Sequence, residues 1–293
     1  MRASTTPGEM KNADTYAGRR LPLFLHSLYS RRSSAIGTSI VLLFLLLAFI
    51  GPVLVPYQVN EQLVDSAGLP PSTSHWFGTD NLGRDIFSRV VLGARDILLL
   101  AGVGTLLAVL IGTSLGLLSG YRGGWLDEVL MRLFDSLLAI PALLFALLLL
   151  GVVGPSRTSI LIVIIIVYVP IVTRVVRSVV LTEKHKGYIT AARLGGERTT
   201  RILFREILPA TFPALSVESS LRFSYAIFLV ASLGFLGVGV QPPNPDWGLM
   251  VNEARTYASQ TPWALFFPAA AIVILVVGVN LLTDGIRRLL NDK

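Results

Sequence analysis

The stretch ILIVIIIVYV at residues 160–169 decides the fold class, because it is apolar without a break. A membrane β-barrel needs apolar and polar residues to alternate along strands of about ten residues, and this stretch has no alternation. It lies within a charge-free run over residues 158–173. Since a bilayer core about 30 Å thick requires roughly 20 apolar residues per helix, this run and its flanks predict one membrane-spanning helix.

Five further charge-free runs extend the pattern on both sides. They cover residues 33–60, 97–121, 136–156, 223–245 and 256–283. Each run is long enough for one span and none for two. We therefore predict an all-α, polytopic membrane protein of six helices, with spans at about 36–56, 97–119, 136–153, 159–180, 223–240 and 264–283. The composition agrees: 15% of the residues are charged, against about 25% in a typical soluble domain.

The positive charges predict the topology. With the amino terminus placed inside, 20 of the 25 Lys and Arg residues fall in inner segments and 5 in outer ones. Short segments rich in Lys and Arg stay on the cytoplasmic side, so both termini and the loop at about 182–222 are expected to be cytoplasmic. Topology then explains the net charge of +7, and no nucleic-acid partner is needed.

Residues 1–34 combine six basic residues with Pro, Ser and Thr and have no sustained apolar pattern. We expect a mostly disordered cytoplasmic tail here, followed by a transmembrane domain over residues 35–293. The first span is longer than the apolar segment of a secretory signal, so it is expected to remain as an uncleaved anchor.

The sequence lacks the residue sets of common enzymes. It has no cysteine, which removes disulfides, thiolate metal ligands and cysteine nucleophiles. It has no P-loop for ATP and no HExxH zinc pattern, and His26, His75 and His185 lie outside the predicted spans. We therefore predict that the chain is not an enzyme by itself and holds no metal or cofactor.

Small residues predict where two helices pack closely. Gly112, Gly116 and Gly120 are spaced four apart, which brings one helix face near a neighbouring backbone. One carboxylate near a span, Asp135, follows Arg132 by three residues, and an ion pair between them is favoured over a proton site.

Prolines and tryptophans refine the boundaries of the spans. Kinks are expected at Pro141, Pro170 and Pro268. All four tryptophans fall at span edges or in loops, where an amphipathic ring suits the headgroup layer. They are Trp76, Trp125, Trp247 and Trp263.

The cytoplasmic loop contains the most informative motif, GYITAARLGG at residues 187–196. It predicts a short helix closed by glycines that can take positive φ. A second short helix over residues 199–208 is expected to end at Pro209.

This loop resembles the signature loop of ABC importer permeases, which has the pattern E-A-A, three residues, Gly, nine residues, I-x-L-P. Ala191, Ala192 and Gly196 match, and Leu208 with Pro209 closes the motif at the right distance. Two positions depart, since Thr190 replaces the usual Glu and Glu206 the usual Ile. An alternative is a basic helix resting on anionic membrane lipid, because Lys184, Lys186 and four arginines lie nearby.

Three further blocks resemble the dipeptide, oligopeptide and nickel branch of these permeases, in particular its second, C-type membrane subunit. They are Phe77–Arg89, Gly120–Asp135 and Ser232–Gly248. Each block also has a purely structural explanation in caps, glycine turns and proline-rich loops, so no substrate contact is assigned.

The resemblance implies a type I importer permease of the bacterial inner membrane that passes peptides. Its expected partners are a second, homologous permease, two ATP-binding subunits that carry ATP and Mg, and an extracytoplasmic solute-binding protein. Docking to the ATPase is expected at Tyr188, Ala191, Ala192, Arg193 and Gly196. Nickel or a metal chelate is the alternative cargo. An ion-coupled secondary transporter is less favoured, because neither internal repeats nor buried ionisable residues are evident.

Overall fold

The computed structural model describes residues 32–59, 61–62 and 64–291, and every regular element in these residues is helical. The elements are α2 (Arg32–Leu54), η1 (Val64–Ser66), α3 (Ile86–Arg122), α4 (Gly124–Leu138), α5 (Ala142–Val153), α6 (Arg157–Glu183), α7 (Gly187–Leu194), α8 (Thr199–Arg201), η2 (Ile202–Ile207), α9 (Leu208–Phe235), α10 (Trp247–Arg255) and α11 (Pro262–Asn291). The tail predicted over residues 1–34 lies outside the described residues, except for residues 32–34, which begin α2.

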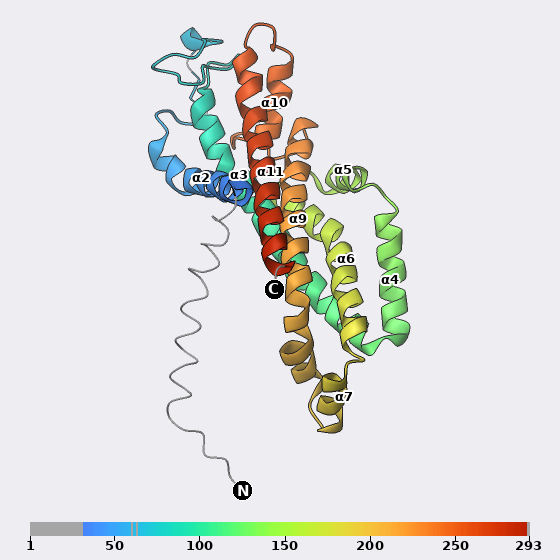
Figure 1. Cartoon of the computed structure of the whole chain (residues 1–293). Helices are drawn as coiled ribbons and strands as arrows, with labels where there is room; N and C mark the ends of the chain where they lie inside the picture. Colours follow the sequence, from blue (N-terminus) through green and yellow to red (C-terminus); the bar gives the residue numbers. More distant parts are fainter. Residues whose placement is uncertain (1–31, 60, 63, 292–293) are drawn as a thin grey trace.

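Five helices are long and apolar enough to cross a membrane, or six if the bent pair α4–α5 counts as one span. The predicted all-α membrane class is confirmed. In Figure 1, α6, α9 and α11 run roughly along the long axis of the molecule and α2 lies across it, with α10 and the loop between α2 and α3 at one end and α7 at the other.

The helices α3 and α6 form the centre of the molecule and run parallel. Gly104 on α3 lies against Ile164 on α6, and Gly112 lies against Val172. The two pairs have the same sequence separation, so the helices keep one register along their interface. A second glycine contact joins α2 to α11, where Gly37 lies against the backbone of Leu282.

Helix α3 begins at Ile86, well before the predicted span at 97–119. Asp85 caps it by accepting a hydrogen bond from the Ser88 N–H at 2.8 Å, which satisfies a free donor of the first turn. At 1.5 Å per residue, 37 residues reach about 55 Å, more than the bilayer core. The charged first turns of α3 therefore extend beyond the membrane.

The helix predicted over residues 136–153 is divided. Helix α4 ends at Leu138, α5 begins at Ala142, and the two meet at an angle of 90°. Pro141 causes the break, since it has no N–H and disfavours helical geometry at the residue before it. In Figure 1, α4 lies apart from the other long helices and α5 turns back towards α9.

The prediction that a short helix ends at Pro209 is wrong. Residues 199–235 form one continuous helical path through α8, η2 and α9. The six residues of η2 are a π-helix, in which the Leu208 N–H bonds to the Leu203 carbonyl five residues back. This wider turn directly precedes Pro209, which has no backbone N–H to donate. The helical path nevertheless continues through Pro209 into α9. Helix α9 then ends at Phe235, short of the predicted position 240, because the Val238 N–H bonds back to the Leu233 carbonyl.

The headgroup prediction is wrong for Trp247. Its side chain is 1% exposed, and its Nε1–H donates to the Val90 carbonyl at 2.9 Å. Trp263 likewise donates to the Thr79 carbonyl at 3.0 Å. Trp76 and Trp125 are exposed. Two tryptophans thus join α3 and the loop before it to the last helices.

Candidate functional site

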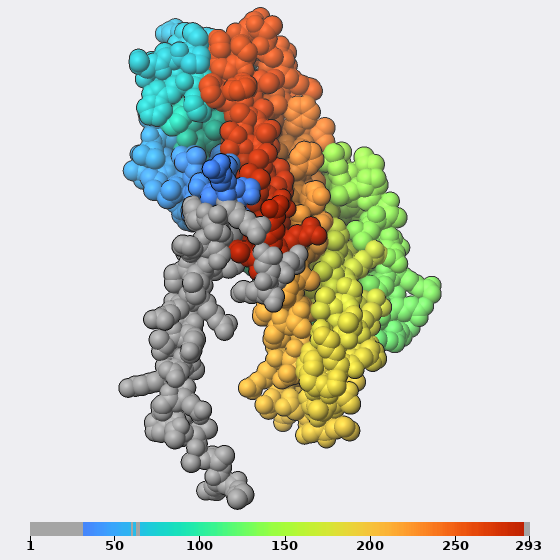
Figure 2. Space-filling model, in the orientation of Figure 1, coloured from blue at the N-terminus to red at the C-terminus, as the bar shows by residue number. Residues whose placement is uncertain are grey.

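Helix α7 forms the lower tip of the molecule, at the opposite end from α10 (Figures 1 and 2). One face of this helix packs against its own chain. Ile189 is fully buried in a cluster with the equally buried Ile202 and Ile207, and Ala192 packs against that cluster. Burial of an isoleucine side chain contributes about 1.5–3 kcal/mol, so α7 is held firmly despite its eight residues.

Polar contacts fix the first turn of α7. The Glu183 carboxylate accepts hydrogen bonds from Lys186 Nζ and from the Tyr188 hydroxyl, each at 2.7 Å. The bonds from Lys186 and Tyr188 both favour the charged form of the Glu183 carboxylate. The same bond to Glu183 raises the pKa of Tyr188 to about 12. The Glu183 carboxylate is therefore an acceptor with two donors, and the Tyr188 hydroxyl keeps its proton at neutral pH.

Arg193 fixes the last turn of α7. Its Nε donates to the Tyr121 hydroxyl at 3.0 Å, and its guanidinium lies 4.7 Å from the centre of the Tyr121 ring. Tyr121 is in the last turn of α3, so α7 is joined to the central pair of helices.

The opposite face of α7 is exposed. Thr190 and Ala191 are exposed, and Leu194 is 85% exposed. Of the five residues predicted for docking, Tyr188, Ala192 and Arg193 therefore hold α7 in place, whereas Ala191 and Gly196 face outwards. Sequence reasoning missed Leu194 and Glu183. Leu194 directly precedes the closing glycines, and a large apolar residue at that position of the motif could have indicated a docking contact.

Gly196 closes the helix as the motif predicts. It has φ +77°, its N–H bonds to the Arg193 carbonyl, and the Glu197 N–H bonds to the Ala192 carbonyl. This is the Schellman arrangement, which favours glycine at the residue with positive φ.

The three predicted packing glycines all lie against α6. A Cβ atom at Gly112 would meet Val172, one at Gly116 would come within 2.7 Å of the Thr173 carbonyl oxygen, and one at Gly120 would meet Val180. The approaches at Gly112 and Gly116 are closer than a side chain permits, so the central pair depends on these glycines.

Ion pairs between α4 and α6 replace the pair predicted within one helix. Asp135 pairs with Arg174, whereas Arg132 pairs with Glu128 at 2.6 Å. Arg177 binds Asp127 through two nitrogens, at 2.5 and 2.6 Å. The expected pair of Asp135 with Arg132 is wrong because α6 brings Arg174 to the face of α4 on which Asp135 lies.

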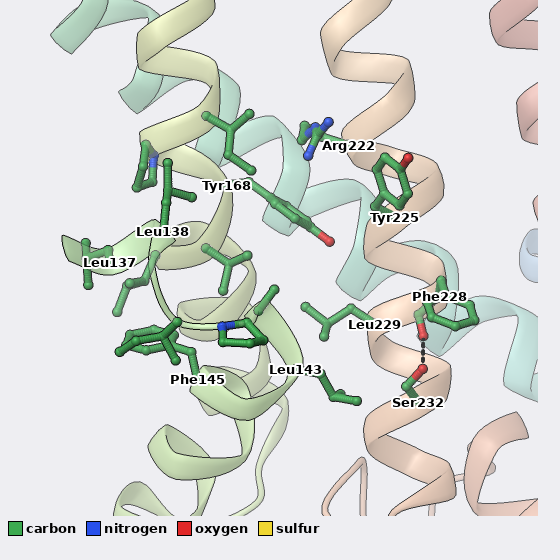
Figure 3. Close-up of a pocket in the computed structure, with 17 residues that line it drawn as sticks. Leu137, Leu138, Leu143, Phe145, Tyr168, Arg222, Tyr225, Phe228, Leu229 and Ser232 are labelled. Atoms are coloured by element: carbon green, nitrogen blue, oxygen red, sulfur yellow. Dashed lines mark hydrogen bonds between the residues drawn. The ribbon is translucent and has the colours of Figure 1, made fainter. Parts of the chain in front are cut away.

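A cavity of about 470 Å³ opens between the α4–α5 turn, α6 and α9. Figure 3 shows Tyr168 extending from α6 towards α9, where Arg222, Tyr225 and Ser232 lie along one side. Arg222 forms an ion pair with Glu218 at 2.8 Å, and its guanidinium lies 4.9 Å from the ring centre of Tyr225 and 5.7 Å from that of Tyr168.

Arg222 is a half-buried charged residue in a long helix. Residues 182–222 were predicted as a cytoplasmic loop, but Arg222 lies well inside the continuous 199–235 helix, beside Tyr168. Tyr168 is about 16 Å from the start of α6 and about 22 Å from its end, which is near the middle of a bilayer core. An arginine at such a depth costs about 2.5–3.5 kcal/mol on insertion scales, and residues of this kind commonly mark a substrate pathway.

At the end of the molecule that carries α10, two of the sequence blocks come together. Asp80 accepts hydrogen bonds from Arg84 Nε at 2.6 Å and from Arg89 Nη1 at 2.7 Å. Arg84 also donates to Glu253 on α10 at 2.6 Å. Two arginines and two carboxylates therefore join the loop before α3 to α10 through a neutral, largely buried network.

Asp246, the one carboxylate in the sequence of the Ser232–Gly248 block, is buried. It caps α10 by accepting the Leu249 N–H at 2.8 Å, and it lies against Gly234, where a Cβ atom would collide with it. Burial raises the pKa of Asp246 to about 6, although backbone hydrogen bonds oppose the shift.

Comparison with known proteins places these features in a family. Residues 112–293 match the model for the binding-protein-dependent transport system inner membrane component, and residues 22–71 match the N-terminal transmembrane domain of oligopeptide transport permease C. The chain is 40% identical to the dipeptide transport permease DppC of Alkalihalophilus pseudofirmus, over 91% of this chain and 88% of that protein. It is 42% identical to the glutathione transport permease GsiD of Pectobacterium atrosepticum, over 86% and 84%. It is 38% identical to the oligopeptide transport permease OppC of Bacillus subtilis, over 90% and 87%.

The chain belongs to the binding-protein-dependent transport permeases. The predicted C-type permease class is confirmed, and the permease is a multi-pass protein of the inner membrane. Within residues 32–59, 61–62 and 64–291, the permease has no group of three or more His, Cys, Asp or Glu residues placed to hold a metal ion.

Proposed function

We propose that this permease is a membrane-spanning subunit of an ATP-driven importer of peptides. The observation that carries the proposal is its identity of 38–42%, over most of both chains, to permeases named for dipeptides, glutathione and oligopeptides. All three cargo names denote peptides or a peptide-like compound, which favours peptide over nickel or a metal chelate. The partners in this proposal are a second permease, two ATPase subunits and an external binding protein.

Uptake by the whole complex tests the proposal. We expect proteoliposomes holding the permease and its partners to accumulate a labelled dipeptide only with ATP and the binding protein. The permease alone is expected to hydrolyse no ATP, because its sequence has no P-loop. Accumulation of Ni²⁺ without peptide uptake would establish the alternative cargo, and uptake driven by an ion gradient without ATP would establish a secondary transporter.

We further propose that the exposed face of α7 docks into a groove of an ATPase subunit. Ala191 and Leu194 supply a small and a large apolar contact on a helix that its own chain holds rigid through Ile189, Glu183 and Arg193. A helix anchored on one side and free on the other transmits the movement of a bound partner to the membrane helices. Both termini and α7 are cytoplasmic in this proposal.

Ala191→Glu is the sharpest test of docking. A charge buried at the interface without a partner is expected to cost roughly 2 kcal/mol or more, so the ATPase subunits should no longer co-purify while the permease stays inserted. Thr190→Glu is the matched control, since it places the same charge at the adjacent exposed position, where the family pattern has Glu.

If the basic segment around α7 instead binds anionic lipid, the opposite pattern of mutant effects is expected. In that case Arg198→Glu, on the exposed basic segment, reduces transport and Ala191→Glu is harmless. Ala192→Glu is a poorer test, because Ala192 packs against the permease's own cluster and its substitution would disturb folding as well.

A further inference from the structure

The cavity between the α4–α5 turn, α6 and α9 has the size and composition of a ligand site. Its volume of about 470 Å³ falls in the usual range for small-molecule pockets, roughly 300–1,000 Å³. Its walls are mainly leucine, isoleucine, proline and phenylalanine, and Arg222 is the one charged residue among those that line it. Apolar walls with one charged anchor suit ligands that share a charged group and differ elsewhere.

The guanidinium of Arg222 lies beside one carboxylate and two aromatic rings. Its contact to Glu218 is made by Nε at 2.8 Å, and the rings of Tyr168 and Tyr225 lie beside it. In the part of the chain that the structure describes, Glu218 is the only carboxylate paired with Arg222, so the two terminal nitrogens have no second ion-pair partner. Paired terminal nitrogens of a guanidinium match the two oxygens of a carboxylate.

Pro170 adds an acceptor to the same wall. Because proline has no N–H, the carbonyl of Ile166 one turn earlier loses its helical donor. Both residues line the cavity. The cavity therefore combines a cationic group, phenol hydroxyls on Tyr168 and Tyr225, and a backbone oxygen without its usual donor.

We infer that this cavity is a substrate-contact site of the permease and that Arg222 binds the free α-carboxylate of the transported peptide. The inference rests on the proposed function, because it takes the cargo to be a peptide. Every linear peptide has one α-carboxylate whatever its side chains, so an anchor for that group serves many sequences. Glu218 forms its ion pair with the Nε atom of Arg222, so the two terminal nitrogens are left for the carboxylate of the peptide.

A ratio of two uptake rates tests the carboxylate contact. Proteoliposomes with the complete transporter take up L-alanyl-L-alanine or its C-terminal amide, and the rate for the dipeptide is divided by the rate for the amide. The binding protein is the same in every sample, so its own selectivity cancels when variants are compared with the natural permease. We expect Arg222→Gln to lower the ratio about tenfold.

Two further variants keep the test decisive if Arg222→Gln leaves Glu218 unpaired and the subunit fails to assemble. Glu218→Gln with Arg222→Gln removes both charges and is expected to lower the ratio equally. Glu218→Gln alone retains the arginine and should retain the preference. Arg132→Gln is the control, because Arg132 forms the same kind of pair with Glu128 four residues earlier but lies outside the cavity.

Several outcomes would overturn the inference. If the double variant Glu218→Gln with Arg222→Gln assembles and transports with an unchanged dipeptide-to-amide ratio, the free carboxylate does not bind at Arg222. A lower rate for both compounds by the same factor would assign Arg222 a structural role, and loss of the second permease subunit from the double variant would assign it to subunit pairing. If the natural complex imports no peptide, the proposed function fails as well. If it does and the ratio is insensitive to Arg222, only this inference fails.

Discussion

At the scale of single residues, the charged side chains matter most through partners that are distant in sequence. Asp127 pairs with Arg177 on another helix, and Arg84 pairs with Glu253 at the end of the molecule that carries α10. These pairs are partly or largely shielded, so removing one partner leaves an unpaired charge in a poor environment. Asp246 differs from them because its partners are backbone N–H groups, and among the described residues it forms no ion pair with a cation.

The stability of the folded permease should depend on pH through the protonation of Asp246. Its folded-state pKa of about 6 lies above the ordinary value of 3.8, so the folded state favours the protonated form. The stability associated with this group is fully present below pH 3.8 and is lost as the pH rises to about 6, by about 2–3 kcal/mol.

Thermal unfolding of the purified permease in detergent between pH 4 and pH 7.5 measures this effect. Asp246→Asn retains a capping oxygen but does not titrate, so the natural permease should lose stability relative to this variant as the pH rises. Parallel pH profiles for the two proteins would show that Asp246 does not titrate in this range.

At the scale of elements, glycines decide which helices approach closely and where α7 ends. Along α3 they differ in surroundings: a Cβ atom at Gly116 would lie 2.7 Å from Val176 and from a backbone oxygen, whereas one at Gly102 would meet only Phe223 at 3.8 Å. The same substitution at the two positions should therefore have opposite effects.

Gly116→Ala is expected to destabilise the permease by about 1–3 kcal/mol, because the α3–α6 backbones must separate to admit a methyl group. Gly102→Ala is expected to stabilise it by up to roughly 0.5–1 kcal/mol through the higher helix propensity of alanine. The unfolding temperature and folded yield of both variants measure the difference. Equal unfolding temperatures for the two variants would show that the α3–α6 contact does not require glycine at position 116.

The turn after α7 allows a second paired comparison. Gly196 has φ +77°, and a Cβ atom added there would meet nothing within 4 Å, so Gly196→Ala is strained by its backbone alone. Gly195 has φ −72°, and alanine fits there. A cost of about 1–2 kcal/mol at Gly196 lowers the hydrogen-exchange protection of the α7 amides roughly 5- to 30-fold. Gly195→Ala should leave it nearly unchanged.

At the scale of the whole molecule, the helices present α7 at one end and the Asp80–Arg84–Arg89–Glu253 network at the other (Figure 1). Arg222 lies between the two ends, at the side of the central helix pair. The continuous helix of residues 199–235, which contains both η2 and Arg222, is the path along which the proposed docking at α7 would act on the membrane helices.

Cysteine labelling tests the predicted topology, since the natural chain has no cysteine. A single cysteine at Gln260 should react with an impermeant reagent in intact cells, whereas one at His185 should react only after the membrane is opened. Both positions are exposed, so accessibility to water does not distinguish them. Labelling of residue 185 from outside would reverse the orientation.

The sequence by itself determined the all-α membrane class and the short helix ended by Gly196. Lipid offers no hydrogen bonds, so each apolar stretch must satisfy its backbone within a helix, and a positive φ in the motif requires a residue such as glycine. Only the tertiary structure decided that Ala191 faces out while Ala192 packs inwards, that Asp135 pairs with Arg174, that Trp247 is buried, and that Arg222 lies beside Tyr168. These features depend on which helix lies opposite each face, and that is set by long-range packing, which local patterns of residues do not encode.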